Sequence, residues 1–270
     1  TYHFALYEYN TTGTCYNLSE LTGNFITFQL KPNIVLNSAN PAVAANNIIQ
    51  GTSNNVIYAF DLSVTTNIAT LTGVTITTSG TYAAANLTNL KCWYSTNATF
   101  EPTDSLLSTK TTSLGAGTHI FPSFTSKTTN PGLTRYSFIT TDLPCSATSG
   151  NTIIVNAITT SDLTFAVGNK SGSASAGGTQ TILTATPNNV TAPATSACAD
   201  GGTTVSWTAP AGCSSNVLVF AKAGSFTSAI PTGNGGSYTA NTVFGSGTAF
   251  DGGFCVYKGT GTTVSVTGLT

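Results

Sequence analysis

The chain has 270 residues, of which 6% are charged, and its formal net charge is −1. A typical soluble domain has about 25% charged residues, so other side chains must supply the polar surface of this protein. The lysines and arginines stand singly along the chain, which excludes the basic stripe of a nucleic-acid-binding protein. No apolar run approaches the roughly 20 residues of a membrane-spanning helix. We therefore expect neither a nucleic-acid partner nor a membrane span.

The composition favours strands over helices. Threonine makes up nearly one fifth of the residues, and serine, asparagine and glycine are also frequent. Threonine suits pleated strands, and the other three suit tight turns, so the chain is predicted to be all-β. The sequence contains no methionine, even at position 1, which indicates that Thr1 is a processed end or the edge of a fragment.

Strand-like segments separated by turn clusters recur along the first two thirds of the chain, as expected for a β-sandwich. A weak helical pattern interrupts them at residues 40–49. A Gly- and Ser-rich stretch at residues 170–180 is followed by Pro187, which places a domain junction near residue 185. The predicted strands are residues 24–30, 55–64, 69–77, 90–94, 134–140 and 152–157.

The last third of the chain resembles a fibronectin type III domain. Residues 203–209 read as a strand with Trp207 in its core face, residues 216–222 as the next strand, and residues 262–269 as a later strand that ends in a Gly-Leu corner. The resemblance implies two further strands after that corner. Their pattern is found at the other end of the chain, where residues 1–10 resemble the sixth strand, with Tyr2, Phe4 and Leu6 facing inward, and residues 17–24 the seventh.

Residues 25–185 resemble a second β-sandwich module that precedes such units in repetitive surface and adhesin proteins of Bacteroidota-type bacteria. The resemblance implies two immunoglobulin-like or fibronectin type III-like β-sandwiches, the second split between the two chain ends. The domains expected are residues 25–185, a β-sandwich module, and residues 186–270, a fibronectin type III-like domain without its last two strands. Residues 1–24 are expected to complete such a sheet in a neighbouring unit.

The six cysteines indicate disulfides. They include no CxxC pair, and only two histidines are available to complete a zinc site. Disulfides favour an extracellular or cell-surface location. The fibronectin-like topology implies a Cys15–Cys213 pair, which would link neighbouring units. Cys92 and Cys145 fall in the other module and are expected to pair there, and Cys198 and Cys255 form the remaining pair.

Attached sugars could solubilise a chain with so little charge. Asn-x-Ser/Thr sequons are glycosylation acceptors, although a chain rich in these residues also produces them by chance. Ser105 lies in an Asp-Ser-Leu sequence that resembles an acceptor motif for O-glycans in such bacteria. The candidate asparagines are Asn10, Asn17, Asn86, Asn97, Asn169 and Asn189.

No catalytic constellation is recognised, so we expect no enzyme activity. His3 and His119 have no nucleophile and orienting carboxylate in sequence patterns typical of a triad. Glu101 and Asp104 lie in a Pro-containing loop, and Glu8 and Glu20 in the N-terminal strands, where solvated acids are the simpler interpretation. No cofactor is expected. A calcium site stays open, although the aspartates are isolated: Asp61, Asp104, Asp142, Asp162, Asp200 and Asp251.

The main functional hypothesis is a structural subunit or repeat unit of an extracellular bacterial filament or adhesin stalk. Its partners would be copies of itself, assembled head to tail by strand complementation, with covalently attached glycans. The alternative is a carbohydrate-binding module of a secreted protein. In that alternative, exposed aromatic rings would stack on sugars; the candidates are Trp93, Tyr94, Tyr7, Tyr9 and Tyr238.

Overall fold

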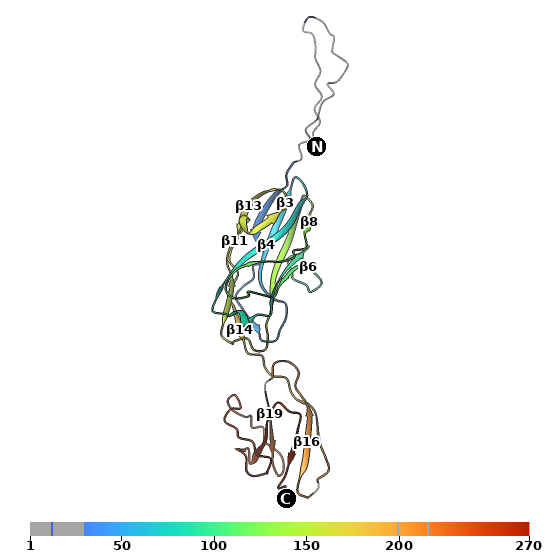
Figure 1. Cartoon of the computed structure of the whole chain (residues 1–270), viewed down its shortest axis with the longest axis vertical. Coiled ribbons are helices and arrows are strands. Elements are labelled where there is room, and N and C mark those ends of the chain that lie inside the picture. Colours follow the sequence, from blue (N-terminus) through green and yellow to red (C-terminus); the bar gives the residue numbers. More distant parts are fainter. Residues whose placement is uncertain (1–11, 13–29, 199, 215, 270) are drawn as a thin grey trace. The chain divides into compact units, whose positions relative to one another are not determined.

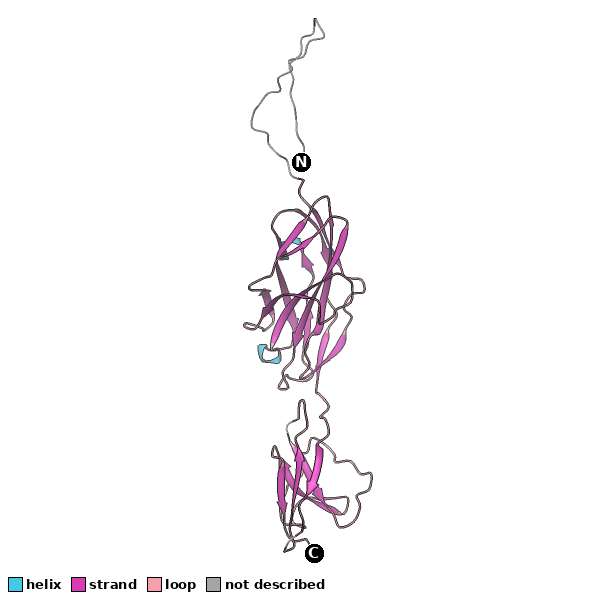
Figure 2. Ribbon diagram, turned by 90° about the vertical axis from the view of Figure 1, so that its right-hand side faces the viewer, coloured by secondary structure: helices cyan, strands magenta, loops and turns pink. Residues whose placement is uncertain are grey.

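The structure is a computed structural model that describes residues 12, 30–198, 200–214 and 216–269. It confirms the all-β prediction, because the described residues form strands and two single-turn 3-10 helices, η1 (Ala84–Asn86) and η2 (Thr160–Asp162) (Figures 1 and 2). The described residues divide into two compact units: residues 30–48 with 52–183, and residues 49–51 with 184–269. The division falls between Leu183 and Thr184, whereas the sequence suggested a junction near residue 185. No helix in the described part of the chain has the length and apolar character to cross a bilayer.

The first unit contains two seven-stranded sheets. In the first sheet, neighbouring strands are antiparallel, except that β1 and β13 run parallel. Its strand order is β11 (Ile158–Thr159), β13 (Asn169–Ala174), β1 (Asn33–Ser38), β3 (Asn55–Thr65), β9 (Leu133–Asp142), β5 (Asn89–Ser95) and β6 (Ser105–Lys110).

The second sheet is organised around the long strand β4 (Ala69–Gly80), which also pairs with β7 (Gly117–Ile120) and β8 (Lys127–Thr129). The main strand order is β12 (Leu163–Phe165), β4, β10 (Thr152–Val155), β14 (Gln180–Leu183) and β2 (Asn46–Ile49). The weak helical pattern at residues 40–49 forms no helix, because its second half is β2, which pairs in this sheet.

Alternation along the strands builds the core between the two sheets. In β3, Tyr58, Phe60, Leu62 and Val64 point into the main hydrophobic core, whereas Ala59 belongs to a separate cluster on the other side of the sheet. This period of two is the strand geometry expected from the sequence. Residues of β4, β10 and β14 complete the same core, so the first unit is a β-sandwich. Each fully buried aliphatic or aromatic side chain contributes about 1.5–3 kcal/mol.

The second unit has two three-stranded sheets. Trp207, Val264 and Val266 of the first sheet share a core with Val256 of the second, and Val217 and Val219 pack against it. The sheets therefore form a small β-sandwich. The strand orders are β15 (Thr191–Thr195), β16 (Thr203–Thr208) and β20 (Thr263–Val266), and β17 (Val217–Ala221), β19 (Gly253–Gly259) and β18 (Ala249–Phe250).

Candidate functional site

The outer edge of β17 is an unpaired apolar sheet edge. Within the described residues, β17 forms its ladder with β19 alone. Its five residues, Val-Leu-Val-Phe-Ala, are each only partly buried. A strand of this composition is typical of a sheet interior, where neighbours on both sides satisfy its backbone and cover its side chains.

The other edge strands of the same unit carry features that limit pairing with another chain. β15 contains Pro193, which has no N–H to donate to a ladder, and β18 and β20 are two and four residues long. β17 contains neither proline nor charge. The charged residue that follows it, Lys222, is paired with Asp251 at 3.4 Å. The β17 edge is therefore the unprotected one of this unit among the described strands.

The two faces of β17 have different surroundings. Val217, Val219 and Ala221 pack against the core shared with Trp207, so Leu218 and Phe220 point to the opposite face. There, the Phe220 ring lies 5.2 Å from the Tyr238 ring and 4.6 Å from the Phe250 ring, measured between centroids. The long connection between β17 and β18, which carries Tyr238, thus covers part of this outer face.

Lysine and aspartate side chains hold this connection in place. The Nζ of Lys258 on β19 donates to the carbonyl oxygens of Gly236 and Tyr238 at 3.1 and 3.2 Å. Asp251 accepts hydrogen bonds from the hydroxyl and the backbone N–H of Thr227 at 2.6 and 2.7 Å. These two bonds, together with Lys222, lower the pKa of the Asp251 carboxyl below its ordinary value. The part of the connection that covers the outer face of β17 is therefore anchored at Thr227 and again at Gly236 and Tyr238.

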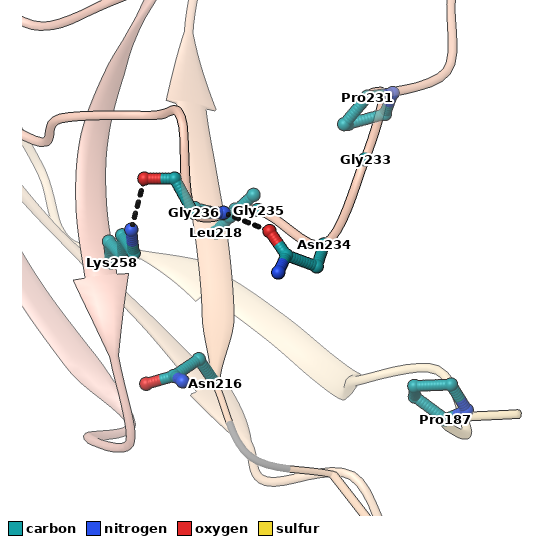
Figure 3. A pocket seen from close by; sticks show the side chains of 9 residues that line it. All are labelled: Pro187, Asn216, Leu218, Pro231, Gly233, Asn234, Gly235, Gly236 and Lys258. Carbon is teal, nitrogen blue, oxygen red and sulfur yellow. Dashed lines mark hydrogen bonds between the residues drawn. The ribbon is translucent and has the colours of Figure 1, made fainter. Parts of the chain in front are cut away.

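A pocket of about 510 Å³ lies beside Leu218 (Figure 3). Its apolar walls are Leu218, Pro187 and Pro231, and its polar lining includes Asn216, Asn234 and Lys258. Lys258 lies on one side of the strand that carries Leu218, and Pro187 and Pro231 lie on the other (Figure 3). Because Lys258 belongs to β19, the prolines mark the side of the unpaired edge. The pocket thus extends alongside the edge where an added strand would lie.

The sequence did not identify this pocket. The Gly-rich segment that lines it matches no phosphate-binding motif, and Leu218 lies within the predicted strand at residues 216–222. The available signal was in β17 itself, where Leu218 and Phe220 are apolar although they face away from the core side. A short strand that is apolar on both faces requires cover on both.

Two of the three predicted disulfides are absent from the structure. Cys92 and Cys255 are buried free thiols, and Cys198 is an exposed one, so neither the Cys92–Cys145 nor the Cys198–Cys255 bridge is formed. Cys145 and Cys213 are each disulfide-bonded. Cys92 points from β5 into the first unit's main core, where it packs as a small apolar side chain. Cys15, the predicted partner of Cys213, lies outside the described residues.

The glycosylation candidates have different environments. Asn97, Asn169 and Asn189 are exposed, and Ser105 is half-buried on β6, where its hydroxyl accepts from Lys127 Nζ at 3.0 Å. Asn86 is 3% exposed, which makes it a poor acceptor for a sugar. Its Nδ2 donates to Thr148, and its Oδ1 accepts from the Ala83 N–H and from Asn151. Asn10 and Asn17 lie outside the described residues, as do the strand residues Tyr2, Phe4 and Leu6.

The candidate catalytic and metal-binding residues stand apart from one another. His119 is buried on β7, with its Nε2 2.8 Å from the Thr78 hydroxyl, and the Asp104 carboxylate accepts from the Glu101 N–H. Within the described residues, no three His, Cys, Asp or Glu side chains gather closely enough to hold a metal ion. Asp61, Asp142 and Asp162 bond to neighbouring protein groups instead. His3, Glu8 and Glu20 lie outside the described residues.

Three of the five aromatic residues named for sugar binding are buried. Trp93, Tyr94 and Tyr238 are 7%, 7% and 8% exposed. Trp93 packs edge-on against Phe100 and donates from its indole N–H to the Thr140 hydroxyl, so its ring faces protein. Tyr7 and Tyr9 lie outside the described residues.

No protein-family model matches the chain, and no curated protein matches it.

Proposed function

We propose that this chain is a structural subunit or repeat unit of an extracellular bacterial filament or adhesin stalk, assembled head to tail by strand complementation. The observation that carries the proposal is the unpaired β17 edge, five apolar residues long and without a protecting proline or charge. A strand added there would satisfy the exposed backbone N–H and carbonyl groups and cover the half-buried side chains.

The donor in this proposal is the segment of residues 1–10 of a neighbouring copy. Its apolar residues Tyr2, Phe4 and Leu6 recur at every second position, which gives one apolar face of three side chains. β17 likewise presents three side chains to the core side, Val217, Val219 and Ala221. The fibronectin type III resemblance supports the match, since such a domain has further strands whose pattern occurs in residues 1–24.

A neighbouring copy is favoured over the same chain because a separately folded unit lies between the two segments in the sequence. A neighbour supplies the strand without a long return of the chain. Donor and acceptor are different surfaces, so the contact is heterologous, and repetition of such a contact propagates an open polymer unless a ring closes. The disulfide-bonded Cys145 and Cys213 fit the oxidising extracellular location that the proposal requires.

The proposal also includes covalently attached glycans, which would keep the polymer soluble. A polymer of chains with 6% charged residues has little electrostatic repulsion between copies. Asn97, Asn169 and Asn189 are exposed and could carry sugars without disturbing the core. Pairing at the β17 edge involves none of these residues.

The test is assembly of the full chain, purified in the oxidised state and followed by light scattering and negative-stain electron microscopy. We expect filaments of regular repeat. Phe4→Asp places a charge on the core-facing side of the donor strand and should leave monomers, whereas Thr12→Asp, beyond the donor strand, should assemble normally. A synthetic peptide of residues 1–10 in excess should shorten the filaments, and the same peptide with Phe4→Asp should not. Monomers at all concentrations of the unaltered chain would contradict the proposal.

A further inference from the structure

We propose that the pocket beside β17 binds the side chain of Tyr7 from the strand that a second copy adds to this edge. The inference rests on the proposed function and deepens it, because it assigns the register of the added strand and the residue that recognises the acceptor. It also assigns a function to the surface formed by Pro187, Pro231 and Asn234, which core packing does not explain.

The direction of the added strand follows from the sheet that receives it. β17 pairs antiparallel with β19, and β18 pairs antiparallel with β19 as well. An antiparallel ladder is also slightly more stable per residue than a parallel one. An antiparallel donor places its C-terminal half beside the first residues of β17, which is the end where the pocket lies.

The register follows from the two apolar faces. Residues directly opposite in a ladder point to the same face of the sheet. In one antiparallel register, all three core-facing donor residues pair with the three core-facing residues of β17: Leu6 with Val217, Phe4 with Val219, and Tyr2 with Ala221. A shift by two residues in either direction leaves one core-facing residue of each strand without a core-facing partner on the other.

This register places Tyr7 opposite Asn216 and diagonal to Leu218, and both of these residues line the pocket. Tyr7 then points to the outer face of the sheet, away from the core, on the same side as Leu218 and Phe220. A parallel donor with the same three core-facing residues would instead place Thr1 opposite Asn216 and His3 opposite Leu218. The pocket therefore distinguishes the two directions by the residue that it receives.

The chemistry of the pocket suits a tyrosine. Leu218, Pro187 and Pro231 offer apolar contact to a ring, and a volume of about 510 Å³ is in the usual range for sites that enclose a small group. The Oδ1 of Asn234 accepts from the Gly236 N–H at 2.9 Å, which leaves the Nδ2 side of the amide toward the pocket as a donor (Figure 3). The side-chain amide of Asn216 has no hydrogen-bond partner among the described residues. Either amide could bond the phenol oxygen, which needs a partner when its ring is buried.

The pocket is formed before a strand arrives. Lys258 ties Gly236 and Tyr238 to β19, and the Tyr238 hydroxyl accepts from the Thr232 N–H at 3.2 Å. Gly233 and Gly235 adopt positive φ angles of 70° and 76°, a conformation that other residues rarely adopt. A preformed wall reduces the ordering cost of binding, so one buried tyrosine can act as an anchor.

The experiment compares assembly of full-length variants by light scattering. Tyr7→Ala should raise the concentration for half-maximal assembly about tenfold, as loss of a buried aromatic anchor does. Tyr7→Phe should retain most of the assembly. Pro231→Asp, in the exposed pocket wall, should weaken assembly, whereas Ser228→Asp adds the same charge to an exposed residue that does not line the pocket and should have no effect. His3→Ala should assemble normally.

Cross-linking supplies a second readout. A photoreactive phenylalanine analogue at position 7, in a mixture of ¹⁴N- and ¹⁵N-labelled chains, should form mixed-isotope cross-links to the peptide that contains Pro231 and Asn234. Normal assembly of Tyr7→Ala, or cross-links to another surface, would overturn this inference and leave the proposed function standing. Dependence on His3 would establish a parallel donor and also overturn it. Failure of the unaltered chain to assemble would overturn the proposed function and this inference together.

Discussion

Lys91 and Asp142 form a 2.7 Å ion pair on the outer face of the first sheet of the first unit, where each side chain is 17% exposed. The pair joins β5 to the end of β9. Lys91 Nζ also donates to the Asn54 side chain, and the Asp142 carboxylate accepts from the Asn54 backbone N–H. Asn54 has a φ of 56°, so the network holds a left-handed residue in the turn that begins β3.

Removal of the Asp142 charge should destabilise the first unit. Asp142→Asn leaves the half-buried Lys91 ammonium without its counter-ion and weakens the bonds to Asn54 and Asn89. We expect a loss of about 1.5–3 kcal/mol, the usual contribution of a hydrogen bond to a charged group, measured by urea denaturation. Glu101→Gln, in an exposed loop of the same unit, is the control and should change the stability by less than about 0.5 kcal/mol. Equal stability of the two variants would contradict the prediction.

The same carboxylate should contribute to acid sensitivity. Burial raises the pKa of Asp142, but hydrogen bonds from Asn89, Lys91 and Asn54 outweigh it and hold the pKa below its ordinary value. A lowered pKa in the folded state means that the unfolded chain binds more protons. The contribution is therefore complete above about pH 5, well above the pKa of an unfolded aspartate, and is lost progressively as the pH falls through the folded-state pKa. Asp142→Asn should remove this part of the acid dependence; an unchanged profile would show that other carboxylates dominate it.

His119 should make the first unit less stable in weakly acidic solution. Burial, together with the positive charge of Lys110, holds the pKa of its imidazole below the ordinary value. The unfolded chain therefore takes up a proton as the pH falls below about 6.5, while the folded chain resists it. Stability should decrease from pH 7.5 to pH 5 in urea denaturation. His119→Gln should flatten this slope, whereas His3→Gln should leave it unchanged if the assignment is correct.

The free thiols should differ in reactivity. Cys198 is exposed, whereas Cys92 and Cys255 are buried, and burial raises the pKa of both buried thiols. A neutral buried thiol is a poor nucleophile. Iodoacetamide should therefore modify Cys198 in the native protein and reach Cys92 and Cys255 only after unfolding, as measured by peptide mass spectrometry. Native labelling of Cys92 as fast as Cys198 would contradict the burial assignment.

Trp93 should act in stability rather than in sugar binding. It packs with Phe138, Ala59 and Ala39 on the outer face of the first sheet, under Phe100. Trp93→Ala should destabilise the first unit by about 3–5 kcal/mol, because it leaves a cavity and an unpaired Thr140 hydroxyl. Urea denaturation measures the loss, and Trp93→Phe should lose less. A stable Trp93→Ala variant with altered binding to polysaccharide would favour the carbohydrate-binding alternative.

Sugars, if attached, should be found on the exposed sequons. Glycopeptide mapping of native material should identify modification at Asn97, Asn169 or Asn189 and none at Asn86. Asn86→Gln should destabilise the protein by about 1–3 kcal/mol, because it displaces a buried amide with partners on both sides, whereas Asn97→Gln should be neutral. A chain that carries no sugar at any exposed sequon would remove the glycan coat from the proposed function.

The strands were predictable from sequence because strand character is a local property. The alternation through Phe60, Leu62 and Val64 and the strand around Trp207 follow from the pleat, which directs successive side chains to opposite faces. The composition likewise determined the all-β class, since threonine-rich segments between turn residues suit sheets. These inferences needed no knowledge of which strand pairs with which.

The solvent exposure of individual side chains depends on contacts between residues that are far apart in the sequence. Asn86 reads as an open sequon, but Thr148 and Asn151 enclose its amide from 62 and 65 residues away. Trp93 reads as a surface aromatic until the loop that carries Phe100 folds over it. Among the described residues, Cys92 is the one cysteine of the first unit's main core, and β17 has the composition of an interior strand although one of its edges is unpaired. A linear sequence specifies the face to which each side chain points, whereas the cover over that face comes from segments that only the folded chain brings together.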